Sequence, residues 1–199
     1  MDTRIEALGK ELVNYKGKSI HENGLREKDK IILWDEIQAI FYEAKQHYEV
    51  IIPTHASMKI SIYGTVGNQI DFNIGSLVTI GDRKKEEMID IYGYIVSQII
   101  ERQRDELLRS LQNGESVKFG EFEISQHAIS RKKLFGGYET IESNRIAGCS
   151  FDGGQFVIEY FDDKGRIKKK QSGYVNAIPN MHLARLHLLT LAEQNASQS

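Results

Sequence analysis

Residues 59–74 read KISIYGTVGNQIDFNI, and this stretch decides what kind of fold the chain can form. Apolar and polar residues alternate on both sides of Val66-Gly67-Asn68, from Lys59 to Tyr63 and from Gln69 to Ile74. A period of two is typical of half-buried strands, and a short glycine-containing link suits a hairpin. The stretch therefore predicts two antiparallel strands with one buried face.

A long amphipathic helix is expected to follow this hairpin. Asp82 can cap its first turn, the helix is expected from about Arg83 to Leu111, and Gly114 lies just past its end. Its apolar stripe consists of Met88, Ile91, Tyr92, Ile95, Val96, Ile99 and Ile100, and continues with Leu107, Leu108 and Leu111. The favoured interpretation is that the stripe packs on the sheet. Alternatively, its last turns bridge to the second half of the chain.

The same order of patterns then begins again. Strand-like runs occupy 116–125, 148–163 and 166–175, and Pro179 suits the first turn of a final amphipathic helix. At the other end of the chain, Ile5, Leu8 and Leu12 have helical spacing, which predicts a short helix or lead-in that ends at Gly17.

The two halves can be aligned as an internal repeat. Ile20 aligns with Ile124, with an Asn23-Gly24 turn in the first copy, and Ile37 aligns with Ile146. The second copy has a longer loop at 134–138. The common order of these matches favours a repeat over a chance alignment of two β-rich halves.

Four motifs carry a resemblance to a known family: ENGL at 22–25, LWDEI at 33–37, VKFGEFEIS at 117–125 and AIPNMH at 177–182. With them the chain, from about Lys18 to Glu193, resembles bacterial pleckstrin-homology-like proteins, more narrowly an uncharacterised bacterial family with two such domains in tandem. The second copy lacks the tryptophan of LWDEI. The resemblance implies an α+β protein with two tandem split β-barrels, each closed by a C-terminal amphipathic helix. It assigns no chemistry.

The expected domains follow from this reading. They are a lead-in at 1–17, a first domain at 18–113, a second domain at 114–195 and a tail at 196–199. Trp34 is expected to be largely buried near the long helix.

Composition excludes several classes of protein. The chain has 199 residues, 40% of them hydrophobic, and a formal net charge of −2, so nucleic acid is an unlikely partner. A single cysteine forms no internal disulfide, and no run reaches the roughly 18 apolar residues of a spanning helix. We expect a cytoplasmic protein.

The sequence predicts no catalytic site, metal site or cofactor. The six histidines lack metal-ligand spacing, and no phosphate-binding loop, dinucleotide fingerprint or nucleophile elbow occurs. Cys149 could be a nucleophile, but a small buried hydrophobe on a strand is the favoured interpretation.

Basic and aromatic residues form the candidate binding site, although charge runs are more often solvated surface. In pleckstrin-homology domains, basic residues on early strand loops contact lipid phosphates, and Arg26, Lys28 and Lys30 occupy the corresponding loop of the first copy. The candidates are Arg131, Lys132, Lys133, Phe135, Tyr138, Lys168, Lys169 and Lys170. Phe135 could instead fasten the two repeats together.

The leading hypothesis is a non-catalytic protein-interaction or scaffold module that binds at a sheet edge beside a helix, with self-association through the same edges as one form of this binding. The alternative is an adaptor for a membrane surface or anionic ligand, and the second alternative is an enzyme.

Overall fold

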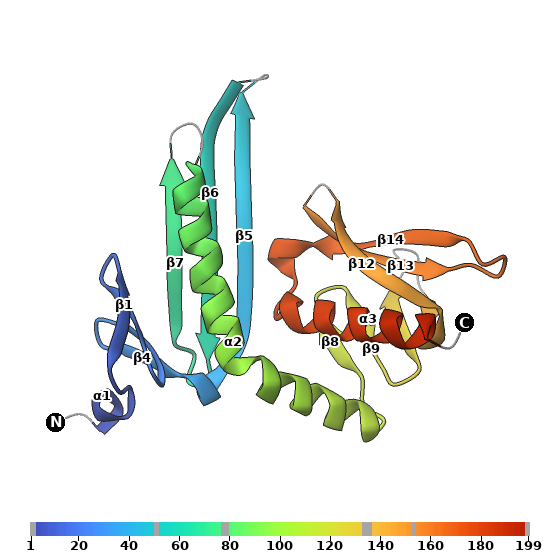
Figure 1. Ribbon diagram of the computed structural model, residues 1–199, viewed down its shortest axis with the longest axis horizontal. Helices are drawn as coiled ribbons and strands as arrows, with labels where there is room; N and C mark the ends of the chain where they lie inside the picture. The colour runs from blue at the N-terminus through green and yellow to red at the C-terminus, as the bar shows by residue number, and fades with distance from the viewer. Residues whose placement is uncertain (1–2, 50–51, 77–79, 133–136, 153, 198–199) are drawn as a thin grey trace. The chain divides into compact units, whose positions relative to one another are not determined.

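The structure is a computed structural model that describes residues 3–49, 52–76, 80–132, 137–152 and 154–197 (Figure 1). The described residues form four antiparallel sheets and three α-helices. The chain divides into two compact units, Met1–Ile99 and Ile100–Ser199, which are called here the first and second unit.

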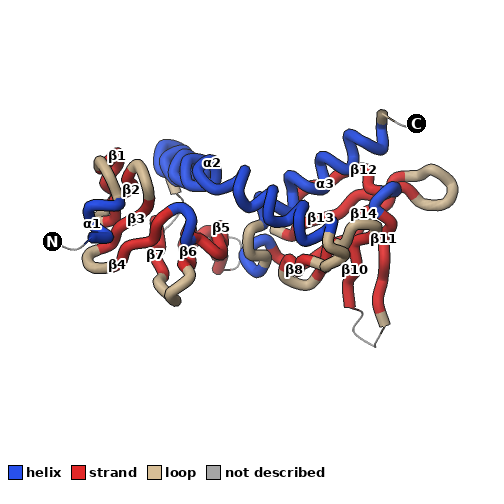
Figure 2. The backbone as a smooth tube through the Cα atoms, turned by 90° about the horizontal axis from the view of Figure 1, so that it is seen from below, coloured by secondary structure: helices blue, strands red, loops and turns tan. Residues whose placement is uncertain are grey.

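The first unit contains a four-stranded sheet followed by a three-stranded sheet and a helix. Helix α1 (Thr3–Ala7) precedes the strands. The first sheet has the order β1 (Glu11–Tyr15), β2 (Lys18–His21), β3 (Gly24–Glu27) and β4 (Lys30–Leu33). The second has the order β5 (Ile37–Glu49), β6 (Ile52–Gly64) and β7 (Gln69–Ser76). Helix α2 (Asp82–Gln112) begins in this unit, and Figure 2 shows it lying against one side of the strands.

The second unit repeats this order. Its first sheet contains β8 (Val117–Phe119), β9 (Phe122–Ile124), β10 (Ala128–Lys132) and β11 (Tyr138–Glu142). Its second sheet contains β12 (Ile146–Asp152), β13 (Gln155–Phe161) and β14 (Ile167–Tyr174), and helix α3 (Met181–Ala196) follows. Among the described residues the sheets do not join into a closed barrel.

The strand register agrees with the repeat found in the sequence. Ile20 on β2 lies opposite Leu25 on β3, and Ile124 on β9 lies opposite Ile129 on β10. A turn of 3₁₀ helix precedes both Ile37 and Ile146, which begin β5 and β12. Each of these strands then shifts register within its first three residues, between Ile37 and Ala39 and between Ile146 and Gly148. The two copies therefore share element order, pairing and the position of a β-bulge.

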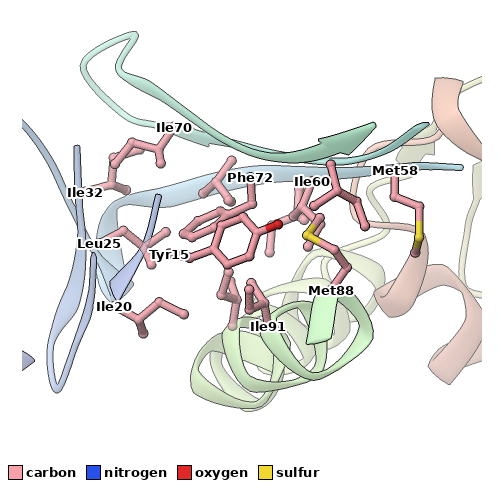
Figure 3. Close-up of a cluster of buried hydrophobic side chains, with 14 of the residues drawn as sticks. Tyr15, Ile20, Leu25, Ile32, Met58, Ile60, Ile70, Phe72, Met88 and Ile91 are labelled. Atoms are coloured by element: carbon pink, nitrogen blue, oxygen red, sulfur yellow. The ribbon is translucent and has the colours of Figure 1, made fainter. Parts of the chain in front are cut away.

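The core of the first unit lies between its two sheets and the first turns of α2. Figure 3 shows Leu25 and Ile32 from the first sheet facing Ile60 and Phe72 from the second, with Met88 from α2 closing the cluster. Burial on this face follows the alternation read in the sequence, since Ile70, Phe72 and Ile74 are buried while their neighbours on β7 are not. The expected apolar face of the hairpin is confirmed.

Helix α2 contributes to two cores. Its stripe from Met88 to Ile99 is buried in the first core, whereas Leu107 and Leu111 are buried in the core of the second unit. The alternative prediction, that the last turns of this helix bridge to the second half of the chain, is therefore confirmed. It also explains why the compact units divide after Ile99, within the helix, and not after residue 113 as the sequence suggested.

The sequence predicted a short helix or lead-in that ends at Gly17, and among the described residues of this segment only Thr3–Ala7 is helical. Helix α1 ends at Ala7, Gly9 has a φ of 72°, and Glu11–Tyr15 forms strand β1 paired with β2. Lys16 and Gly17, with φ values of 51° and 79°, make the two-residue turn between these strands. Such turns need positive φ at both central positions and match the twist of a hairpin.

Candidate functional site

The predicted basic loop is the connection between β10 and β11. Arg131 and Lys132 end β10, and Tyr138 begins β11 with 64% of its surface exposed. Lys133 and Phe135 lie outside the described residues. The structure therefore places three of these five candidates on the strands that flank the loop.

Arg131 is not a freely solvated cation, and this corrects the sequence interpretation. Its guanidinium forms an ion pair with Glu121 in the β8–β9 turn and donates a 2.6 Å hydrogen bond to the Gln171 carbonyl on β14. The ion pair lies within the first sheet of the second unit, and the hydrogen bond to Gln171 connects this sheet to the second. Replacing Arg131 consequently removes structural contacts as well as charge.

Two of the three lysines on β14 are paired with carboxylates. Lys170 lies 2.6 Å from Glu139 on β11, and Lys169 lies 3.3 Å from Glu159 on β13. Lys168 is exposed and has no ion-pair partner among the described residues. The predicted cations thus lie on neighbouring strands, but acidic side chains accompany most of them.

A hollow of about 1140 Å³ in the second unit brings several of these groups together. Its charged lining contains four cations and three carboxylates. The cations are Lys118, Arg131, Lys132 and Lys170, and the carboxylates are Glu121, Glu123 and Glu139. A site for anionic headgroups needs a clear basic excess near the surface. The near balance of charge makes this hollow a poor match for an anionic surface.

A second hollow, in the first unit, has a different character. It is a groove of about 620 Å³ between strands β1 and β2 and the first turns of helix α2. Its apolar lining consists of Val13, Ile20, Ile91 and Tyr94, and its charged lining consists of Arg83, Glu86, Glu87 and Asp90. We refer to these eight residues as the β1–α2 groove.

The floor of the groove is an exposed continuation of the first core. Val13 lies opposite Ile20 across the β1–β2 pair, and Ile20 and Ile91 belong to the core cluster of Figure 3. Yet Val13 is 46% exposed and Tyr94 is 36% exposed. Strand β1 is the edge of its sheet and among the described residues pairs only with β2. An apolar floor therefore adjoins a strand whose outer backbone groups have no neighbouring strand.

Trp34 supports one wall of this groove. Its ring packs edge-on against Tyr94 of α2, with ring centres 6.3 Å apart, and its Nε1–H donates a 2.8 Å hydrogen bond to the Glu22 carbonyl. The expected packing near the long helix is confirmed. Trp34 is only partly buried, however, because it lies at the margin of the core beside the groove.

The charged lining of the groove is predominantly acidic. Glu86, Glu87 and Asp90 give it three negative charges against the single positive charge of Arg83. No ion pair joins any of these four side chains to another residue that the structure describes. The groove could not be predicted from the sequence because its residues come from three elements that meet only in the folded chain.

Ser19 and His21 form a buried pair of residue types that can act together in catalysis. The Nδ1–H of His21 donates to the Gly9 carbonyl at 3.2 Å, which leaves Nε2 to accept from the Ser19 hydroxyl at 2.8 Å. Both side chains are less than a tenth exposed, and neither lines either hollow described above. The pair holds the N-terminal segment against β2.

Cys149 lacks the properties of a nucleophile. Burial raises the pKa of its thiol to about 11, so the thiol is protonated at neutral pH, whereas the thiolate is the reactive form. Within the described part of the chain, no group of three or more His, Cys, Asp or Glu side chains is arranged to hold a metal ion.

In the described residues, no helix has the length and apolar character needed to cross a membrane. A comparison with curated proteins finds no matching relative. The model of a protein family described as a family of unknown function, DUF6585, matches residues 5–198 of this sequence, and the chain therefore belongs to the DUF6585 family.

Proposed function

We propose that this protein is a non-catalytic interaction module that binds an extended segment of a protein partner in the β1–α2 groove. The observation that carries the proposal is the combination of an apolar floor and an unpaired strand edge in one place. Val13 and Tyr94 leave large parts of their surfaces exposed beside β1, which is the edge strand of its sheet.

Strand addition supplies the binding mechanism. An extended segment can hydrogen-bond to the outer N–H and C=O groups of an edge strand, and its alternate side chains then face the adjoining hollow. In this groove those side chains would contact Val13 of β1 on one side and Ile91 and Tyr94 of α2 on the other. Backbone pairing provides affinity, and the groove selects side chains.

Charge defines the partner further. Glu86, Glu87 and Asp90 outnumber Arg83, and none of them is neutralised by an ion pair to another described residue. Complementary charge favours a segment that carries Lys or Arg beside its apolar side chains, and it disfavours acidic segments. The proposed ligand is therefore an extended segment with alternating apolar and basic residues.

We also infer that each unit is a pleckstrin-homology-like domain, with the cytoplasm as the proposed compartment. The support for the fold is the order of elements, which is the same in both units: four meandering strands, three meandering strands and a helix. In such a domain the helix closes one end of the two sheets, and a groove beside that helix is a natural position for a peptide.

An adaptor for anionic surfaces is the second candidate. It is supported by the exposed Lys132 and Lys168 beside the aromatic Tyr138. The ion pairs of Arg131, Lys169 and Lys170 weaken it, because these charges are already balanced. Flotation with vesicles of anionic phospholipid distinguishes the candidates, since the groove proposal predicts no capture.

The test compares two valines. Fluorescently labelled peptides with alternating valine and lysine, or alternating valine and glutamate, are titrated with the full chain and followed by fluorescence anisotropy. We expect the basic peptide to bind and the acidic peptide to bind at least about tenfold more weakly. Val13→Asp should abolish binding, whereas Val66→Asp, which changes an exposed valine in the β6–β7 turn, should not. Equal binding by both variants would refute the groove as the site.

A further inference from the structure

Strand β14 of the second unit has the features of a ligand for this groove. Ile167, at its beginning, is 57% exposed and lies opposite Phe161, which is also exposed. The two side chains form an apolar pair on the outer face of the β13–β14 hairpin. Among the described residues β14 pairs only with β13, so it is an edge strand like β1.

The orientation of the backbone shows which residues face this free edge. The Gln171 carbonyl points away from β13, because it accepts a hydrogen bond from Arg131 on the other sheet. Backbone groups of alternate residues point the same way along a strand. Ile167 and Lys169 therefore also direct their N–H and C=O groups to the free edge, and the Arg131 contact at Gln171 lies further along the strand than both of them.

The charge of β14 is opposite to that of the groove. Residues 166–171 read RIKKKQ, with four cationic side chains and no carboxylate. Carboxylates of other segments pair with three of these cations: Asp162 with Arg166, Glu159 with Lys169 and Glu139 with Lys170. Lys169 keeps 63% of its side-chain surface exposed although it pairs with Glu159, and Lys168 is exposed. The segment thus presents lysines on both sides of the strand, next to an exposed isoleucine.

The hairpin turn gives this strand a fixed shape before any partner binds. The Asp162 carboxylate accepts hydrogen bonds from the backbone N–H groups of Lys164 and Arg166, at 2.9 and 3.0 Å, and from the Arg166 guanidinium at 2.7 and 2.9 Å. These bonds hold the pKa of Asp162 well below its usual value, at about 2. A strand ordered in advance loses little conformational entropy on binding.

We propose that the segment bound in the β1–α2 groove is strand β14 of a second copy of this chain. The inference rests on the proposed function of the groove and names its partner. The exposed edge of β14 extends the sheet at β1, Ile167 contacts the apolar floor, and Lys169, which shares a strand face with Ile167, faces the acidic side chains of α2. Groove and strand are different surfaces, so the contact is head-to-tail and each added copy leaves a free groove and a free strand.

A charge-exchange experiment tests this pairing. Sedimentation of the full chain over a range of concentrations measures self-association. Three variants are compared with the wild type: Glu86→Lys with Asp90→Lys, Lys168→Glu with Lys169→Glu, and all four changes together. The changed side chains are all exposed. Circular dichroism melts confirm that each variant is folded.

We expect the wild type to form a concentration-dependent series of oligomers. Each double variant should associate about tenfold more weakly, since the attraction between the acidic groove and the basic strand becomes a repulsion between like charges. The fourfold variant should recover most of the wild-type association. Lys118→Glu with Lys132→Glu is the matched control, because it makes the same change in net charge as Lys168→Glu with Lys169→Glu on exposed lysines of two other strands, β8 and β10, and it should associate like the wild type.

Three results would overturn the inference: a wild type that remains monomeric at all concentrations, double variants that associate as the wild type does, or a fourfold variant no better than the double variants. Its failure is distinguishable from failure of the groove. A monomeric protein that still binds the valine–lysine peptide through Val13 retains the proposed function and lacks only this partner.

Discussion

Acidification should destabilise this protein through a buried histidine in the second unit. His182 lies in the first turn of α3, and its Nε2 is 2.9 Å from the side-chain oxygen of Gln103 on α2. Gln103 is itself only 5% exposed. Burial lowers the pKa of His182 from 6.5 to about 4, so the imidazole is neutral in the folded protein near neutral pH.

The sign and the magnitude of the effect follow from this pKa. Below pH 6.5 the unfolded chain binds a proton at this position, whereas the folded chain binds one only near pH 4. The free energy of unfolding contributed by neutral burial is therefore complete above pH 6.5 and is lost as the pH falls toward 4. At about 1.4 kcal/mol for each pH unit between the two values, the full loss is about 3 kcal/mol, and roughly 2 kcal/mol is lost by pH 5.

Urea denaturation of the full chain, followed by circular dichroism from about pH 7 to about pH 5, measures this loss before most carboxylates titrate. His182→Gln keeps a hydrogen-bonding side chain without the titration, so its stability should depend much less on pH. Burial also lowers the pKa of His187, and this contribution remains in both proteins. His127→Gln, a change at an exposed histidine, is the control and should behave as the wild type. If wild type and His182→Gln lose equal stability, the reasoning from burial is refuted.

Three further substitutions test the packing. Arg131→Ser should lower the free energy of unfolding by about 1 kcal/mol, because it breaks the hydrogen bond between the sheets and the ion pair with Glu121. Lys132→Ser should change the free energy of unfolding by less than about 0.5 kcal/mol. Equal effects of the two substitutions in chemical denaturation would contradict this expectation. Trp34→Ala should lower the free energy of unfolding by about 2 kcal/mol, because Trp34 is only partly buried. A fully buried tryptophan loses about 3–5 kcal/mol on truncation to alanine, so a loss of that size in the same assay would mean that the side chain is buried. Gly24→Ala should lower the free energy of unfolding by about 1–3 kcal/mol, because the added Cβ would lie 2.5 Å from the Ile32 carbonyl oxygen. Thermal or urea unfolding measures this loss, and an unchanged stability would show that strands β3 and β4 can separate without cost.

Sequence periodicity predicted the repeated core well, because burial of one strand face leaves a local record. The alternation around Ile70 and Phe72 matches their burial, and the alignment of Ile20 with Ile124 matches their places on β2 and β9. The expected helix from Arg83 to Leu111 corresponds to α2 to within a residue at each end. These features depend on spacing within a single segment, which the sequence contains.

The first strand was harder to predict because helical spacing occurs among residues that do not share a helix face. Ile5, Leu8 and Leu12 have helical spacing, yet Leu8 is fully buried while Ile5 and Leu12 are exposed, so they share no common face. The useful signal was the turn. Lys16-Gly17 connects two short runs that end in Tyr15 and begin with Lys18, a length typical of a tight hairpin.

The binding residues proposed from the sequence show why charge runs are weak evidence for a site. The pairing of Arg131 with Glu121, and of Lys170 with Glu139, depends on strands that meet only in the folded chain. A run of cations in the sequence gives no information about which carboxylates face it. The near balance of charge around the second-unit hollow could therefore be found only from the structure.

The same reasoning explains why the β1–α2 groove is the better candidate. Glu86 and Asp90 are one helical turn apart on α2, where acidic residues on a solvated face require no explanation. In the structure they adjoin exposed apolar side chains from another element, and none of the described cations neutralises them by an ion pair. A solvated helix face needs no apolar neighbour, and a core needs no unpaired acids. Their coincidence beside an edge strand is what a binding site for a basic, extended segment requires.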